Sequence, residues 1–132
     1  MADPVSTVVS LLEADSAVSA LVGPNVFGGE LPRSDPPTMP QKAVVVVPSA
    51  GPSNLGGGWL PFNDFRVDVI CYGATPFEAY GVWDVVVPAL TDALKHDRVH
   101  WARTAAGPIQ YRDPATDWPI ARGSFQVLAN QP

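Results

Sequence analysis

The chain has 132 residues, which suits one domain and is too short for two separate hydrophobic cores. Hydrophobic residues make up 46% and charged residues 16% of the sequence, a balance typical of a chain that folds. The net charge is −5 and the 8 Lys and Arg residues are scattered, which disfavours strong binding to nucleic acid because such binding usually needs clustered basic side chains.

Compartment and domain number follow from a few further features. No stretch approaches the roughly 20 consecutive apolar residues of a membrane span. No basic segment leads into an apolar run at the N-terminus, so we expect no signal peptide and a cytoplasmic protein. The one cysteine, Cys71, cannot form an internal disulfide and cannot hold a metal alone. With no internal repeat and no linker, residues 1–132 are expected to form a single domain.

The N-terminal segment predicts a helix followed by a short turn. Asp3 is a suitable N-cap, and Pro4 stands where a first-turn proline is tolerated. Asp15 or Ser16 restarts the chain as a short turn, which Gly23 ends. The apolar residues of the first helix recur at helical spacing and form one stripe: Val5, Val8, Val9 and Leu12.

Three strands are expected before the longest helix. Residues 25–27 suit a short strand, and the valine run at 43–47 lacks alternation, which indicates burial on both faces. Residues 65–72 alternate, so one face should pack on the helices and Cys71 should be a small core residue, not a nucleophile. The members of that face are Phe65, Val67, Val69 and Cys71.

The longest helix begins at Thr75. Thr75, Pro76 and Glu78 form a capping-box pattern with proline at the first helical position. Pro88 lies on the outer face and should bend the helix. The predicted core stripe contains Ala79, Val82, Trp83, Val86, Leu90, Ala93 and Leu94.

The last third alternates strand and turn. Residues 99–103 and 109–112 are predicted to pair as a hairpin that turns at Gly107 and Pro108, and residues 120–130 form the last strand. The expected fold is α+β: a mixed, mostly antiparallel sheet with an N-terminal helix and one long amphipathic helix packed on one face.

Motifs for chemistry are weak. The Gly56–Gly58 run fits no phosphate-binding fingerprint, because neither a helix nor a Lys-Ser/Thr pair follows it. His96 and His100 are four residues apart, but solvated side chains explain them better than a metal site. Asp64 and Asp68 suit cross-strand pairing with basic residues, and Asp113 and Asp117 suit a turn. We therefore predict no catalytic, cofactor-binding or metal-binding residue.

A long Gly- and Pro-rich loop at residues 48–61 ends in large apolar side chains. Such side chains either fold back onto the parent sheet or contact another subunit, because exposed apolar patches often mark interfaces. We take Trp59, Leu60 and Phe62 as the candidate subunit interface.

The order of elements resembles the tail terminator (tail-completion) proteins of long-tailed bacteriophages, over nearly the whole chain. The features that carry the resemblance are a helix leading into SAVSALVGPNVFGGELP (Ser16–Pro32), the proline-introduced strand MPQKAVVVVP (Met39–Pro48), the strand–turn–helix FRVDVICYGATPFEAYGVWDVVVPAL (Phe65–Leu90), and the turn and final strand RDPATDWPIARGSFQVLA (Arg112–Ala129).

The resemblance implies a structural virion protein and no enzyme. Such proteins form a ring, typically a hexamer, that caps the head-proximal end of the tail tube, ends tube polymerisation and offers a surface for head attachment. The implied partners are further copies of the chain, the major tail tube protein and the head–tail connector proteins. The ring is assembled in the host cytoplasm, carries no cofactor, does not contact membrane, and lets DNA pass without specific binding. Six spheres of roughly 36 Å diameter leave an opening of similar width, which admits a duplex.

Three other functions remain open from sequence. The first is another neck protein, such as a head-completion or connector adaptor. The second is a small-molecule-binding domain, although no convergent polar pocket is evident. The third is an enzyme.

Overall fold

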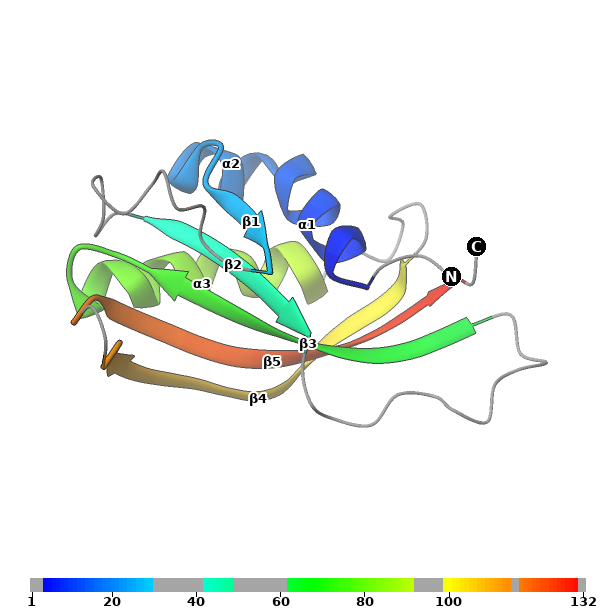
Figure 1. Cartoon of the computed structure of the whole chain (residues 1–132). Helices are drawn as coiled ribbons and strands as arrows, with labels where there is room; N and C mark the ends of the chain where they lie inside the picture. The colour runs from blue at the N-terminus through cyan, green and yellow to red at the C-terminus, as the bar shows by residue number, and fades with distance from the viewer. Residues whose placement is uncertain (1–3, 30–41, 49–61, 92–98, 115–116, 131–132) are drawn as a thin grey trace.

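Three helices cover one face of a five-stranded sheet within the part of the chain that the computed structural model describes, residues 4–29, 42–48, 62–91, 99–114 and 117–130 (Figure 1). The strand order is β1-β2-β3-β5-β4. Only β1 and β2 are parallel, and the other pairs are antiparallel. In chain order the elements are α1 (Pro4–Ala14), α2 (Ser16–Val22), β1 (Val26–Gly28), β2 (Ala43–Pro48), β3 (Phe62–Tyr72), α3 (Pro76–Thr91), β4 (Val99–Arg112) and β5 (Pro119–Asn130). The predicted α+β class and helix placement are confirmed.

Side-chain caps begin two of the helices where the sequence predicts them. The Asp15 carboxylate accepts hydrogen bonds from the backbone N–H groups of Ala17 (2.9 Å) and Val18 (3.0 Å) and so starts α2. The Thr75 hydroxyl accepts a 3.2 Å bond from the Glu78 N–H at the start of α3. These bonds satisfy donors that have no partner inside the helix.

The main core lies between the helices and the sheet. Trp83 of α3 stacks obliquely on Phe125 of β5, with ring centroids 5.2 Å apart. Gly123 is required beside them, because a Cβ at that position would clash with the Trp83 ring and lie 2.8 Å from the Ala106 carbonyl oxygen. The buried residues of α3 are Ala79, Val82, Trp83, Val86, Ala89 and Leu90, which confirms the predicted stripe as far as Thr91.

A second, smaller cluster lies on the outer face of the sheet, the face opposite the helices. Val45 of β2 and Ile70 of β3 are paired there, and Tyr72 meets the Trp118 ring edge-on with centroids 6.2 Å apart. The valine run of β2 is therefore buried on both faces, as its lack of alternation predicts.

The fourth strand differs from the sequence prediction. β4 is one strand that pairs with β5 along its length, with Ala102 opposite Val127 and Tyr111 opposite Ile120. The register shifts on both sides of Ala106, and Gly107 has a φ of +95°. The predicted hairpin is wrong because Gly107 and Pro108 interrupt the ladder as a bulge instead of reversing the chain. A proline is tolerated there because β4 is a terminal strand of the sheet.

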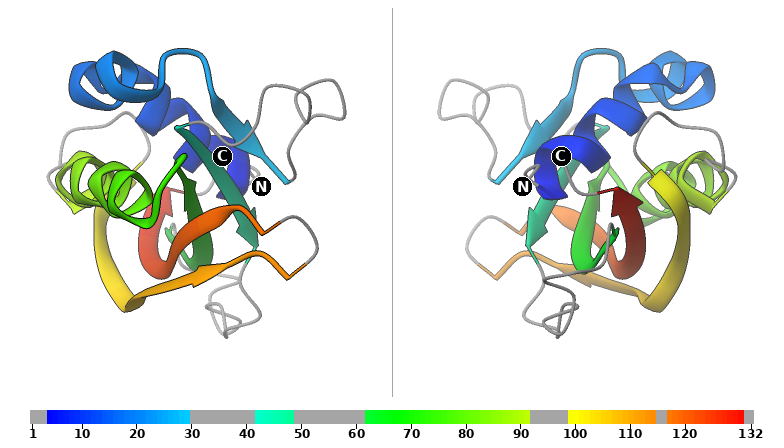
Figure 2. Two further views of the ribbon diagram at one scale, coloured as in Figure 1. Left: turned by 90° about the vertical axis from the view of Figure 1, so that its left-hand side faces the viewer. Right: turned by 90° about the vertical axis from the view of Figure 1, so that its right-hand side faces the viewer.

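The helices share the cover of the sheet unequally. α1 lies toward β1 and β2, whereas α3 lies over β4 and β5 (Figure 2). None of the described helices is long and apolar enough to cross a membrane alone. α1 and α2 together have the length and composition, but they are bent by 88° and bury apolar side chains in the core. The predicted N-cap Asp3 and the predicted end of the long helix at Ala93 and Leu94 lie outside the described residues.

Candidate interaction surface

The cysteine and the two histidines of the chain form no reactive site within the described residues. Cys71 is fully buried on the helix side of β3, and burial raises the pKa of its thiol, which stays protonated. His96 lies outside the described residues, and the side chain of His100 in β4 is also outside them. In the described ranges, no three His, Cys, Asp or Glu side chains are placed to hold a metal ion.

The aspartates of the last turn are structural, as predicted. The Asp117 N–H donates to the Asp113 carbonyl oxygen at 2.7 Å, and the Asp113 N–H donates to the Trp118 carbonyl oxygen at 2.9 Å. An exposed ion pair of 3.7 Å joins Arg112 to Asp117. These contacts close the turn between β4 and β5.

Asp68 is the centre of a polar network on the outer face of the sheet. Its carboxylate accepts hydrogen bonds from Arg122 Nη2 at 2.7 Å and from Ser124 Oγ at 2.6 Å, both on β5. The hydrogen bond to Asp68 raises the pKa of Arg122, and a further bond to Tyr111 adds to this effect. The cross-strand pairing expected for Asp68 is thereby confirmed, and it occupies the carboxylate without leaving a free acid–base pair.

Arginines dominate the central part of the same face. Arg66, Gln126 and Arg103 lie opposite one another on β3, β5 and β4, and Arg103 Nη2 donates to Gln126 Oε1 at 3.1 Å. Arg66 Nε is buried and has no hydrogen-bond partner among the described residues. We call Arg66, Arg103 and Arg122 the arginine face. The exposed Ile109 lies opposite Arg122, at the edge of this face.

A second exposed surface runs along α3. Phe77 is 87% exposed and Tyr80 is 39% exposed, although both are large and apolar. Five residues at helical spacing form this surface, which we call the α3 stripe: Phe77, Tyr80, Gly81, Asp84 and Pro88. Because the opposite side of α3 fills the core, this helix is apolar on both sides, a pattern typical of helices that are covered in an assembly.

Two shallow hollows flank Phe77 on the α3 stripe. One of about 330 Å³ extends toward Gln110 of β4 and contains Asp84 in its wall. The other, of about 250 Å³, extends toward Leu21 of α2 and Lys42. An opposing protein surface can pack around the protruding ring of Phe77 and fill the hollow on each side of it.

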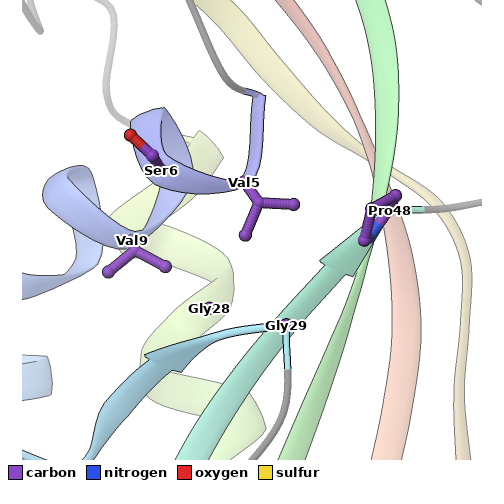
Figure 3. Close-up of a pocket in the computed structure, with 6 residues that line it drawn as sticks. All are labelled: Val5, Ser6, Val9, Gly28, Gly29 and Pro48. Carbon is purple, nitrogen blue, oxygen red and sulfur yellow. The ribbon is translucent and has the colours of Figure 1, made fainter.

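A third concave site lies between α1 and the ends of β1 and β2 (Figure 3). It encloses about 470 Å³ and is lined by Val5, Ser6, Val9, Gly28, Gly29 and Pro48. A Cβ at Gly28 would lie 3.1 Å from Val5 Cγ1, so the glycine lets α1 approach β1 closely. Among the described residues, the lining holds one hydroxyl and no titratable side chain, which suits apolar contact.

Comparisons with known proteins indicate where this fold occurs. No family model matches the sequence, and no curated protein matches it either. A chain in the solved structure of the virion of a native gene transfer agent particle superposes with a TM-score of 0.64 over 97% of this chain and 95% of that chain. The two chains share a fold. At 20% sequence identity, the likeness concerns the fold alone.

The sequence-predicted interface and the α3 stripe are different surfaces. Trp59 and Leu60 lie outside the described residues, and Phe62 starts β3 with a side chain that is also outside them. The predicted core stripe of the long helix does not include Phe77 and Tyr80. The sequence signal for them is a second apolar stripe, three and four residues apart, in a helix without basic residues.

Proposed function

We propose that the chain is a structural protein of a phage-like virion, and more narrowly the tail terminator. In this role, copies of the chain form a ring, a hexamer, on the head-proximal end of the tail tube. The ring ends tube polymerisation and offers a surface for head attachment. The observation that carries the proposal is the fold shared, over nearly the full length of both chains, with a chain of a gene transfer agent virion. The order of sequence elements supports the narrower role.

The surfaces described above suit a protein that acts by shape. A ring interface joins two different patches on each subunit, and the ring closes when the rotation between them divides a full turn. The α3 stripe and the arginine face are two such patches, on different elements of the fold. With a net charge of −5 on each chain, the ring is acidic overall, so DNA slides through without tight binding.

The loop residues Trp59, Leu60 and Phe62 belong to the same proposal as contacts of the ring with a neighbouring subunit. Large apolar side chains that follow a Gly-rich segment can reach beyond their own domain. The proposed site of action is the neck end of the virion tail. The proposed partners are the major tail tube protein and the head–tail connector proteins.

A second candidate is another neck protein, a head-completion or connector adaptor. The likeness to a chain of a virion particle is compatible with this role as well, because it does not single out one part of the virion. Both candidates act by assembly, so the discriminating observation is the morphology of defective particles.

Removal of the gene from its phage or prophage tests the two candidates. Loss of a terminator gives tails of irregular and excessive length, whereas loss of a head adaptor gives tails of normal length beside separate filled heads. Negative-stain images of the purified protein with tail tubes complete the test, with rings expected at tube ends. Normal, joined particles in the absence of the gene would refute both roles.

A further inference from the structure

We propose that the α3 stripe of one subunit binds the arginine face of a second copy of this chain, in a head-to-tail contact. The inference rests on the proposed function, because it names the surfaces that join the ring. Neither surface was part of the interface predicted from the sequence.

The α3 stripe is apolar and acidic. Asp84 is exposed and stands seven residues after Phe77, two helical turns along the same side of α3. The helices α1, α2 and α3 contain no Lys or Arg within their bounds. Lys42 borders the hollow beside Glu78, but the hollow that contains Asp84 has no basic residue among the described members of its lining. The stripe therefore offers one aromatic anchor and one carboxylate that can take a cation.

The arginine face is the complement of this surface. It presents Arg66, Arg103 and Arg122. The acidic side chain that the structure describes among them is Asp68, which pairs with Arg122. The buried Arg66 Nε has no acceptor among the described residues. Ile109, 66% exposed, adds an apolar contact at its edge.

The spacing of the two surfaces is compatible. Phe77 and Asp84 are separated by about 10 Å along a helix axis. On the sheet, the row of Arg103 and the row of Ile109 are four residue steps apart along β5, from Gln126 to Arg122, or about 14 Å. Phe77 can therefore pack on Ile109 while the Asp84 carboxylate binds Arg103, since the long arginine side chain can close the difference.

A head-to-tail contact explains the charges better than pairing of two α3 stripes. Pairing of two α3 helices across a two-fold axis would bring their acidic side chains together. No Lys or Arg on either helix would neutralise them. Like charges at an interface are strongly unfavourable. Contact between two different faces avoids this repulsion, and repetition of such a contact generates a closed ring or a filament.

Charge reversal on each side tests the contact. Asp84→Arg alone and Arg103→Asp alone should each weaken self-association by at least about tenfold at low salt, because each places like charges together. The double variant Asp84→Arg with Arg103→Asp should recover the loss. A 1:1 mixture of the two single variants should also recover assembly in a ring with an even number of subunits, because the variants can alternate. Sedimentation velocity and negative-stain counts of capped tail tubes measure both effects.

Matched variants separate this contact from general effects. Glu13→Arg changes the net charge equally at an exposed site on α1 and should leave association unchanged. Phe77→Ser should abolish assembly while the thermal unfolding midpoint stays within error of the parent value, because that ring is exposed in the single chain.

The outcomes are distinct. Recovery in the double variant supports the contact. Assembly that tolerates both single reversals, or a loss that the double variant does not recover, overturns it and leaves the ring intact as a proposal. Stronger association of Asp84→Arg would instead indicate paired α3 stripes and would overturn the contact as well. A parent chain that stays monomeric both free and with tail tubes would overturn the inference and the proposed function together.

Discussion

Two aromatic rings and one glycine determine how α3 sits on the sheet. Trp83 is 3% exposed and packs on the fully buried Phe125. Gly123 leaves the space that the indole occupies, so the large side chain of Trp83 on α3 lies against a residue of β5 that has no side chain. The loss of any one of them leaves a void or a clash that the close-packed core cannot absorb.

Replacement of Trp83 by alanine should lower the free energy of unfolding by about 3–5 kcal/mol, because it removes a buried aromatic side chain and leaves a cavity. Tyr80→Ala on the same helix is the control and should cost much less, since that ring is partly exposed. Chemical denaturation followed by circular dichroism measures both changes. Equal losses in the two variants would contradict the assignment of Trp83 to the core.

Burial of Cys71 makes stability depend on alkaline pH. Burial raises the pKa of its thiol, so the folded chain keeps the proton while the unfolded chain loses it above about pH 8.5. The free energy of unfolding should therefore fall as pH rises, by about 2 kcal/mol between pH 8.5 and 10. Burial and nearby Asp113 also raise the pKa of Tyr72, which adds a further loss at higher pH. The Cys71→Ala variant should lose most of the dependence between pH 8.5 and 10, and an unchanged slope in that variant would exclude the thiol as its source.

At the scale of elements, capping residues close in sequence explain where α2 and α3 begin, and the position of β4 at the edge of the sheet explains its bulge. Asp15 and Thr75 cap α2 and α3 with the hydrogen bonds that their side chains predict. β4 depends on its place at the end of the sheet, which accommodates Pro108 and two shifts of register around Ala106. The same bulge blunts a long terminal strand that could otherwise pair with another sheet.

Loss of the cap at α2 should be measurable. Asp15→Ala removes an acceptor for two N–H groups and should lower the free energy of unfolding by about 1 kcal/mol. Asp15→Asn keeps an acceptor oxygen at the same place and should retain most of the stability. Urea titrations of the three proteins give the comparison, and an alanine variant as stable as the parent would show that the cap contributes nothing.

At the scale of the whole molecule, the fold separates two different surfaces. The helices lie on one face of the sheet (Figure 1). By strand register, the arginine face is on the other. A subunit with unlike patches on different sides is suited to a repeating contact. This arrangement is compatible with the proposed role in assembly.

Trp59→Ala tests the loop as an additional contact in the assembly. We expect the thermal unfolding midpoint of the monomer to stay nearly unchanged and the self-association to weaken, because the proposed partner of this ring is another subunit. Trp118→Ala is the matched control: that ring packs on Tyr72 within the chain, so it should lower the midpoint instead. If Trp59→Ala unfolds the chain, the ring belongs to the core and the loop contact is wrong.

The sequence by itself determined the caps of α2 and α3, the core side of α3 and the double burial of β2, because these features follow from composition and from spacing within one segment. Only the tertiary structure decided that Gly107 and Pro108 form a bulge, that Asp68 pairs with Arg122, and that Phe77 stays exposed while Trp83 is buried. Each of these depends on residues distant in the sequence. A Gly-Pro pair becomes a turn or a bulge according to the strand beside it, and an apolar helix side becomes core or surface according to the sheet that covers it.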